Sequence, residues 1–151
     1  MDMKKSIRDI AERFDCVAIY FFGSQTGSGK KYLEGEDVRK DIFSDLDVAV
    51  AFREPPTEAV QIYGKIYREM SELLEPFNVD LVFMHELGTL FQCEVIKGLR
   101  VYEKHERLTD EFEEGVLKRA EDLMFKKKIL DRDIMEAIED GYIEFEYSPN
   151  S

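Results

Sequence analysis

The sequence predicts an α/β protein in which short buried strands alternate with amphipathic helices. Three stretches have the length of buried strands: the continuous apolar run 17–22, and 46–52 and 79–84, which are apolar apart from Asp47 and Asp80. Between and after these runs, apolar residues recur at the spacing of a helix that buries one face. This alternation is what assigns the chain to the α/β class.

The remaining elements follow from local patterns. The apolar spacing predicts helices over 3–14, 57–74, 87–96, 109–127 and 131–139. A further short strand is expected at Val101-Tyr102, after a turn at Gly98. The polar stretch 25–41, which holds three glycines and several lysines, predicts a loop. The tail 142–147 alternates apolar and acidic residues, as an edge strand or a docking segment would.

Length, composition and charge exclude several classes of protein. A chain of 151 residues is long enough to bury one core, and we expect a single domain, with the sheet and its helices in 1–100 and a helical part and tail in 101–151. The net charge of −12 argues against direct nucleic-acid binding, which needs cations to neutralise phosphates. No apolar run approaches the roughly 20 residues that span a bilayer, and no secretory pattern is visible. We therefore expect a cytoplasmic protein without membrane contact.

Several residue types that often carry chemistry have ordinary interpretations here. Cys16 and Cys93 lack any partner motif and are expected to be small buried hydrophobes. His85 and His105 have no partner at a metal-ligand spacing. The aromatic residues that we expect in or near the core are Tyr20, Phe21, Phe22, Tyr63 and Tyr67.

Three carboxylates stand at the edges of predicted strands. Asp45 and Asp47 open the strand 46–52 and, two residues apart, share one of its faces, while Asp80 stands near the start of a later strand. Asp45 alone could be a capping residue and Asp80 a turn neighbour, but Asp is disfavoured in strands. Two carboxylates about 4 Å apart repel by roughly 4 kcal/mol at an effective dielectric near 20. Together the three predict a site for Mg²⁺ or Mn²⁺, which prefer such oxygen ligands.

The dipeptide Gly23-Ser24 ends the first predicted strand. Glycine lets the backbone approach a phosphate closely, and the serine hydroxyl and the following amides can donate hydrogen bonds to it. Most Gly-Ser pairs are ordinary turns, so this pair indicates a phosphate-binding site only in combination with the acids that follow. Divalent cations and phosphates commonly bind together.

Gly23-Ser24, then Asp45-x-Asp47 on the next strand, then Asp80 on a later strand form a pattern that resembles the nucleotidyltransferase superfamily, which includes DNA polymerase beta. Within it, the chain is similar to the minimal nucleotidyltransferase (MNT) group, which includes MntA-like antitoxins of HEPN/MNT pairs. The likeness continues through 91–103 and the long helix from Thr109, so it covers nearly the whole chain.

This resemblance implies a fold and a reaction. The fold is a small mixed central β-sheet that carries the acids and is flanked by helices. The reaction moves a nucleoside monophosphate, expected to be AMP from ATP, to an acceptor hydroxyl and releases pyrophosphate. Many members of the group are antitoxins that add AMP to a tyrosine of a HEPN-domain ribonuclease toxin.

The resemblance also implies a role for each site residue. Gly23 and Ser24 would hold the triphosphate, and Asp45 and Asp47 would bind the metal ions. Asp80 would help to bind the second metal and would orient or deprotonate the acceptor hydroxyl. Two metals that stabilise the attacking and leaving oxygens can accelerate such a reaction without a covalent intermediate.

Two features depart from the family pattern. Twenty residues separate Ser24 from Asp45, more than is usual in the family, and this marks 27–41 as an insertion. An arginine often follows the Gly-Ser pair, whereas Gln25-Thr26 stand here. Long charged side chains on loops are usually solvated, but four could supply the missing charge: Lys30, Lys31, Arg39 and Lys40.

The sequence leaves three functions open. The leading hypothesis is an active nucleotidyltransferase that uses ATP and Mg²⁺ and modifies a HEPN-like partner protein. The second is a noncatalytic antitoxin or binding module that masks its partner through its acidic surface or through 142–147. The third is transfer to a small hydroxylated molecule such as an aminoglycoside, which would usually require a deeper enclosing site.

Overall fold

The computed structural model describes residues 2–36 and 45–141. In chain order the elements are α1 (Met3–Arg13), β1 (Cys16–Phe22), α2 (Thr26–Leu33), β2 (Leu46–Phe52), α3 (Ala59–Leu73), β3 (Val79–Phe83), the 3-10 turn η1 (Met84–Glu86), α4 (Thr89–Ile96), β4 (Leu99–Glu103) and α5 (Glu106–Glu139). The four strands and the helices α1, α3 and α4 begin and end within two residues of their predicted limits. The helices α2 and α5 differ from the prediction.

The four strands form one mixed sheet in the order β3-β2-β1-β4. Strand β1 runs antiparallel to both β2 and β4, whereas β2 and β3 run parallel to each other. A parallel pair needs a crossover connection, which α3 supplies. This sheet confirms the predicted fold class.

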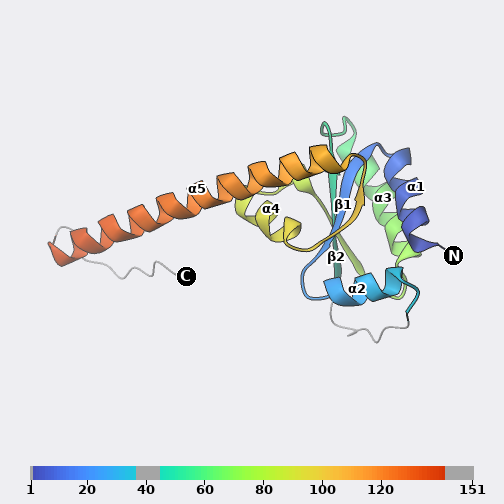
Figure 1. Ribbon diagram of the computed structural model, residues 1–151, viewed down its shortest axis with the longest axis horizontal. Coiled ribbons are helices and arrows are strands. Elements are labelled where there is room, and N and C mark those ends of the chain that lie inside the picture. The colour runs from blue at the N-terminus through green and yellow to red at the C-terminus, as the bar shows by residue number, and fades with distance from the viewer. Residues whose placement is uncertain (1, 37–44, 142–151) are drawn as a thin grey trace.

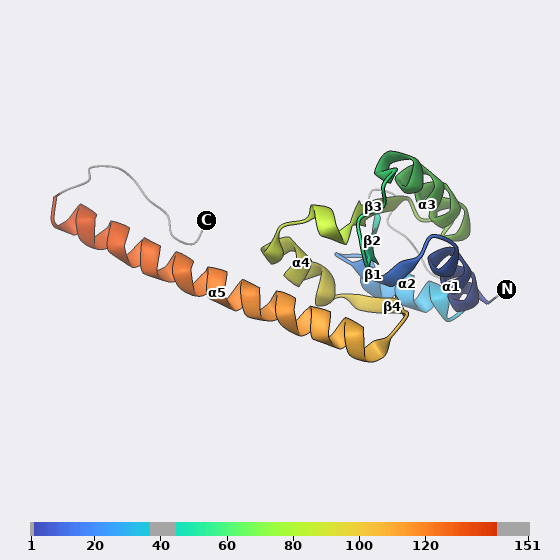
Figure 2. The ribbon, with the colours of Figure 1, turned by 90° about the horizontal axis from the view of Figure 1, so that it is seen from above.

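Helices cover both faces of the sheet (Figure 1). The view from above shows α1 and α3 side by side on one face, and α4 with the first part of α5 on the other (Figure 2). The core under α1 and α3 is built from Ile7, Ile19, Val48, Val50, Ile66, Met70 and Leu81. The core under α4 is built from Ala18, Tyr20, Phe22, Ala49, Ala51, Met84 and Val95. Because both faces are buried, the central strands are apolar throughout except for Asp47 near the start of β2.

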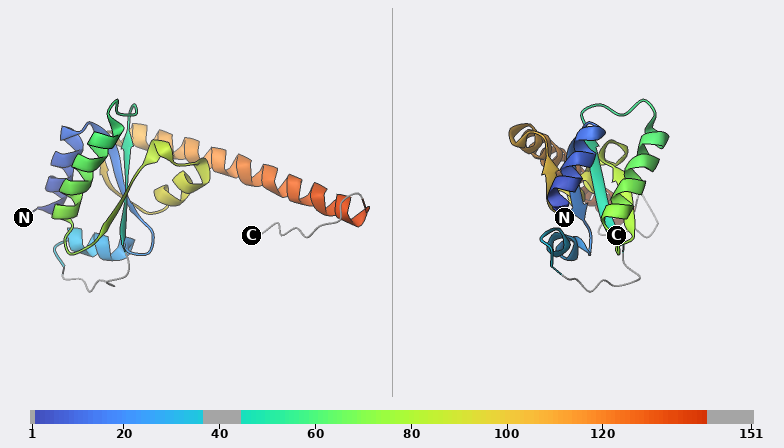
Figure 3. Two further views of the ribbon diagram at one scale, coloured as in Figure 1. Left: turned by 180° about the vertical axis from the view of Figure 1, so that it is seen from behind. Right: turned by 90° about the vertical axis from the view of Figure 1, so that its right-hand side faces the viewer.

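The prediction of a loop over 25–41 is wrong for Thr26–Leu33, which form α2. This helix lies across one end of the sheet (Figure 3). A Cβ atom at Gly29 would lie 2.9 Å from the ring of Phe21 and 3.0 Å from Leu46, so the glycine permits close packing of α2 against the strands. The rest of the predicted loop, 37–41, and the tail 142–147 lie outside the described residues.

The prediction of two C-terminal helices is also wrong, because α5 is one helix of 34 residues. At 1.5 Å per residue it is about 50 Å long. No proline or glycine interrupts it after Gly115, and Lys127 pairs with Asp131 at 3.0 Å across the region where a break was expected. Its first part packs on α4, and the remainder extends away from the sheet (Figures 1 and 3).

Both cysteines are buried and free, as expected. Burial and the nearby Asp15 carboxylate raise the pKa of the Cys16 thiol to about 12, so it is an unreactive core side chain. None of the helices within 2–36 and 45–141 combines the length and the hydropathy that crossing a membrane would require.

Arg100 on β4 anchors α5 to the sheet. Its guanidinium donates to Glu113 at 2.9 Å and to Asp110 at 2.8 Å, both on α5, and it also pairs with Glu103. The buried Tyr20 hydroxyl donates to the same Glu113 carboxylate at 2.8 Å. One arginine and one tyrosine therefore fix the start of the long helix over β1 and β4.

We expect Arg100→Ala to lower the free energy of unfolding by about 2–3 kcal/mol, because it leaves partly buried carboxylates without their cation. Urea denaturation measures the change. The control is Arg68→Ala, which removes an exposed i,i+4 pair with Glu72 and should change stability by less than about 0.5 kcal/mol. If the two losses are equal, apolar contacts alone hold α5.

Candidate functional site

The strand register places two acids side by side. Asp47 on β2 is the direct neighbour of Asp80 on the parallel strand β3, and it lies opposite Phe22 on the antiparallel strand β1. Side chains alternate along a strand, so Asp47 and Asp80 point to the same face of the sheet. They lie at the end of the sheet where β1 finishes and where β2 and β3 begin.

The three acids differ in exposure. Asp47 is partly buried, whereas Asp45, just before β2, and Asp80 are exposed. Partial burial raises the pKa of the Asp47 carboxyl, and the neighbouring Asp80 and Asp45 carboxylates raise it further. Negative charge is therefore concentrated around Asp47, as the spacing predicted.

The described residues do not form a closed metal site by themselves. Across 2–36 and 45–141, no group of three or more His, Cys, Asp and Glu side chains is close enough to hold an ion. The structure brings Asp47 and Asp80 together, and the exposed Asp45 just before β2 is near enough to raise the pKa of Asp47. Any ion at this place would need further oxygen ligands from a substrate or from water.

Gly23 packs directly over Asp47. Its φ is +79°, in the left-handed region that favours glycine, and a Cβ atom there would lie only 2.2 Å from Oδ2 of Asp47. The turn is closed by Thr26, whose hydroxyl donates to the Gly23 carbonyl at 2.9 Å. The sequence identified Gly23 from the Gly-Ser pair, but its contact with Asp47 follows from the register.

Helix α2 begins directly after this turn. Its first residue, Thr26, follows Ser24 by two positions, so the amino end of the helix lies beside the turn that covers Asp47. The amino end of a helix presents unpaired N–H groups and a partial positive charge. Lys30 and Lys31 lie in the last turn of α2 instead, and Arg39 and Lys40 fall outside the described residues.

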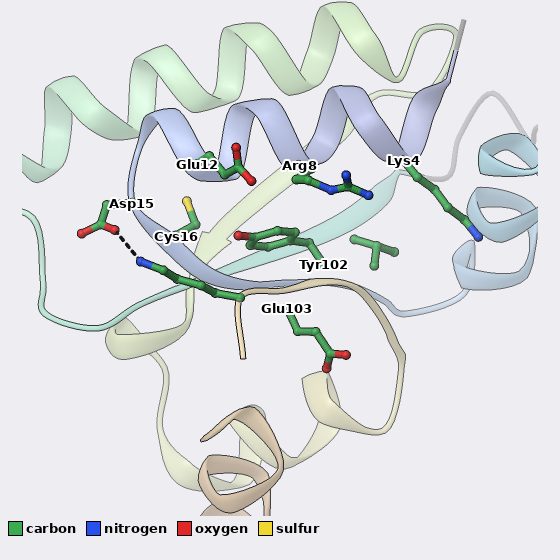
Figure 4. Close-up of a pocket in the computed structure, with 9 residues that line it drawn as sticks. Lys4, Arg8, Glu12, Asp15, Cys16, Tyr102 and Glu103 are labelled. Carbon is green, nitrogen blue, oxygen red and sulfur yellow. Dashed lines mark hydrogen bonds and ion pairs between the residues drawn. The ribbon is translucent and has the colours of Figure 1, made fainter. Parts of the chain in front are cut away.

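Two hollows lie away from the acids. One, of about 610 Å³, lies between α1 and β4, where Arg8, Glu12 and Tyr102 face one another and Lys104 pairs with Asp15 (Figure 4). The other, of about 790 Å³, lies over Ala18 and Ala51 at the opposite end of the strands and includes His85 and His105. Neither hollow includes Asp45, Asp47 or Asp80, so these acids do not line either of them.

The aromatic predictions are confirmed for Tyr20, Phe21 and Phe22, which are buried, and for Tyr63, whose ring lies near the core against the buried Phe83, but the prediction is wrong for the exposed Tyr67. Tyr63 is on the same helical face as the buried Ile66 and Met70 but near the start of α3, where it reaches the edge strand β3, whereas Tyr67 points away from that face. Phe91 on α4 is a residue that sequence reasoning missed, and its ring meets Phe22 edge to face at 5.9 Å. In the sequence, Phe91 was visible only as one apolar residue in a predicted helix whose apolar residues do not gather on one face.

We expect Gly23→Ala to lower the free energy of unfolding by about 2 kcal/mol or more, because it adds a clash with Asp47 to an unfavourable φ. The matched control is Gly27→Ala, where a Cβ atom meets nothing within 4 Å and alanine favours helix. Chemical denaturation compares the two. Equal stability of both variants would show that the turn tolerates a side chain.

Comparisons with known proteins agree with this architecture. The family described as "Polymerase beta, Nucleotidyltransferase" matches residues 5–107. One chain of a substituted MntA–HpeT toxin–antitoxin complex superimposes with a TM-score of 0.62 at 16% identity, over 87% of this chain and 98% of that chain. A toxin–antitoxin structure with AMP-PNP gives 0.60 at 18% identity, over 87% and 98%. No curated protein sequence matches the chain.

A third solved structure contains the tri-AMPylated HEPN toxin of Shewanella oneidensis in complex with its MNT antitoxin. It superimposes with a TM-score of 0.60 at 15% identity, over 88% of this chain and 96% of that chain. At such identities the likeness shows a shared fold, whereas the family match spans all four strands and every candidate acid. The chain therefore belongs to the polymerase beta-like nucleotidyltransferase family, with the fold of the MNT antitoxins.

Proposed function

We propose that the chain is a metal-dependent nucleotidyltransferase that moves AMP from ATP to a hydroxyl of a partner protein. One observation carries the proposal: the register sets Asp47 beside Asp80 and directly beneath the Gly23 turn. A nucleotide held by the turn would thus have its phosphates next to the acids. The new bond joins the acceptor oxygen to the α-phosphorus, and the bond from this phosphorus to the bridging oxygen breaks to release pyrophosphate.

The turn and α2 supply the groups that a triphosphate needs. Gly23 has no side chain, so the phosphates can approach the backbone closely. Ser24 is exposed and can donate its hydroxyl, and the first amides of α2 can donate as well. These contacts reach only the phosphates and do not distinguish one nucleobase from another. Our assignment of ATP rests on the likeness to the toxin–antitoxin structure with AMP-PNP.

The donor set fits Mg²⁺ or Mn²⁺. Carboxylate oxygens are the hard ligands that these ions prefer, and Mg²⁺ is commonly held by one or two carboxylates together with substrate phosphates. Asp45 and Asp47 would hold the ions, with Asp80 as a further ligand, and the phosphates would complete a set that the acids leave open. When bound, the ions would neutralise the phosphate oxygens and stabilise the attacking and leaving oxygens.

The position of Asp80 supports a role in binding the acceptor. It lies on β3, the edge strand of the sheet, and its carboxylate is exposed. From this edge it can accept a hydrogen bond from an incoming hydroxyl and take its proton as the new bond forms.

A protein acceptor is supported by the surface of α5. Beyond the part that packs on α4, five large apolar side chains are 40% to 66% exposed: Leu123, Met124, Phe125, Leu130 and Met135. Exposed apolar surface of this extent commonly marks a site of protein contact. The likeness to an MNT antitoxin bound to an AMPylated HEPN toxin makes a HEPN-type toxin the partner that we propose, in the cytoplasm where ATP is available.

The test combines the purified chain with Mg²⁺, ATP labelled at the α-phosphate and the HEPN-type product of an adjacent gene. We expect label on the partner protein, and a rate at least about 100-fold lower for Asp47→Asn. Asp9→Asn, which alters an exposed acid on α1, is the matched control and should keep the wild-type rate. ATP labelled at the γ-phosphate should leave no label on the partner.

Other outcomes would favour the competing functions. Label transfer that survives Asp47→Asn would overturn the assigned site. Toxin neutralisation that persists in Asp47→Asn without nucleotide would favour a noncatalytic masking antitoxin. Label on an aminoglycoside, with resistance in a sensitive host, would favour a small-molecule acceptor.

A second test follows from the raised pKa of Asp47. Ionisation of this carboxyl opposes folding, so its penalty appears as the pH rises through its folded-state pKa and is absent below the unfolded value of 3.8. Without divalent cations, Asp47→Asn should raise Tm at pH 7.5, and this gain should vanish at low pH.

Mg²⁺ should stabilise the wild-type chain and not Asp47→Asn, the reverse of the order of stability expected without the ion. At ten times its Kd it should stabilise the wild-type chain by about 1.4 kcal/mol, or roughly 3–6 °C, and should not stabilise Asp47→Asn. Scanning calorimetry with and without Mg²⁺ measures both effects, with Asp9→Asn as control. An equal shift in Tm for the wild type and Asp47→Asn would contradict the metal assignment.

A further inference from the structure

An aromatic pair lies beside the acids, on the face of the sheet that α4 covers. Asp47 shares a face of β2 with Ala49 and Ala51, and both alanines belong to the core under α4. Phe22, the residue of β1 that pairs with Asp47, belongs to the same core. The Cβ atoms of such a cross-strand pair stand about 5 Å apart. Phe22 is therefore an immediate neighbour of Asp47.

The second member of the pair is Phe91, on the first turn of α4, and it leaves much of its ring open. The rings of Phe91 and Phe22 meet edge to face, with centroids 5.9 Å apart and an interplanar angle of 83°. Phe22 is buried, whereas Phe91 is 49% exposed. Among the residues that the structure describes, Phe22 is the one aromatic ring that Phe91 meets. About half of the Phe91 side chain is thus available to a ligand.

Phe91 is held in place because the residues around it are anchored. The side-chain amide of Gln92 donates to the main-chain carbonyl of Met84 at 2.9 Å, and this bond ties the start of α4 to η1. Val95, one turn further along α4, is fully buried in the same core as Phe22. A ring whose position is fixed before binding loses little entropy when a ligand stacks on it. Helix α4 therefore presents Phe91 in a manner suited to binding a planar group.

The strand order places Phe91 on the nucleotide side of the acids. Gly23, which forms the turn over Asp47, directly follows Phe22 in the chain. Asp80 lies on β3, and β2 separates β3 from β1 in the sheet. Phosphates at the turn and a planar ring on Phe91 would both lie on the β1 side of Asp47. This arrangement leaves the β3 side, with Asp80, to the acceptor.

We propose that the ring of Phe91 is the platform on which the nucleobase of the donor nucleotide stacks. This inference rests on the proposed function and assigns a residue to the part of the nucleotide that the Gly23 turn and the acids do not contact. Phenylalanine has no hydrogen-bond donor or acceptor in its side chain, so it binds the face of a base and does not read its edge. Every base has such a face, and stacking strength sets the preference. We therefore expect purines, with their larger ring system, to gain more from Phe91 than pyrimidines, and ATP and GTP to gain equally.

The first test measures nucleotide binding by titration calorimetry, with Mg²⁺ and a non-hydrolysable ATP analogue. We expect Phe91→Ala to raise the Kd for the analogue about 5- to 150-fold, the factor that corresponds to a stacking contribution of about 1–3 kcal/mol. The matching GTP analogue should lose affinity by the same factor within about 2-fold. The Kd for inorganic tripolyphosphate, which has no base, should not change. Phe91→Tyr, which keeps a stacking ring, should bind the ATP analogue like the wild type.

Leu90→Ala is the matched control for the binding test. Leu90 lies next to Phe91 on the first turn of α4 and is likewise 49% exposed, but it has no aromatic ring. This variant should bind the ATP analogue with the wild-type Kd. Phe91→Leu keeps an apolar contact with Phe22, so a raised Kd for the analogue in this variant reports the loss of the ring and not the loss of packing.

A spectroscopic test locates the base. The chain has eleven phenylalanines, so labelling with 4-fluorophenylalanine gives eleven fluorine signals, and the signal missing in Phe91→Leu identifies Phe91. With Mg²⁺ present, the ATP analogue should shift this signal in a saturable manner, whereas tripolyphosphate should leave it in place.

The outcomes separate this inference from the proposed function. If no label reaches the partner protein but the ATP analogue shifts the Phe91 signal, the proposed reaction fails and the base platform stands. If label transfer occurs but Phe91→Ala leaves the Kd for the analogue unchanged, the platform is overturned. An equal rise in Kd for the analogue and for tripolyphosphate would show a structural role and overturn it as well. A raised KM for the acceptor in both Phe91→Ala and Leu90→Ala, with nucleotide binding unchanged, would assign the pair to partner contact instead.

Discussion

The parallel register between β2 and β3 is the constraint on which the site depends. It sets Asp47 beside Asp80, so two carboxylates that repel each other occupy neighbouring positions on one face of the sheet. The opposite face of the same strands is packed against α1 and α3, and a shift by one residue would turn its apolar side chains outward. The buried core therefore enforces an arrangement that electrostatics alone would oppose.

Gly23 extends this constraint to a third strand. The antiparallel register of β1 brings the end of that strand over Asp47, and only a residue without a Cβ atom fits there. Close packing at Gly29 then holds α2 against the same end of the sheet. Phosphate-binding groups and acids thus come from three separate segments, and their relative positions are set by backbone pairing and not by side-chain contacts between them.

Under the proposed function, the end of the sheet that carries the acids performs the reaction, and the long helix α5 contacts the partner protein. The acids lie at one end of the sheet, where Asp45 and Asp80 are exposed and could be reached by a large acceptor. Arg100 and Tyr20 hold the start of α5 on the sheet, and this attachment lets the rest of the helix extend with its apolar side chains exposed. An exposed site and an exposed helix are both suited to a macromolecular partner.

The sequence alone determined the strands, the acids at their edges and the glycine that precedes them. Strands buried on both faces are continuously apolar, and an acid at such a strand is conspicuous. Tertiary structure decided the rest. Thr26–Leu33 form a helix because Gly29 packs against Phe21 and Leu46, a contact across the fold that local propensity does not encode. Tyr63 is partly exposed because it reaches the edge strand β3, and the adjacency of Asp47 and Asp80 depends on a pairing between distant segments.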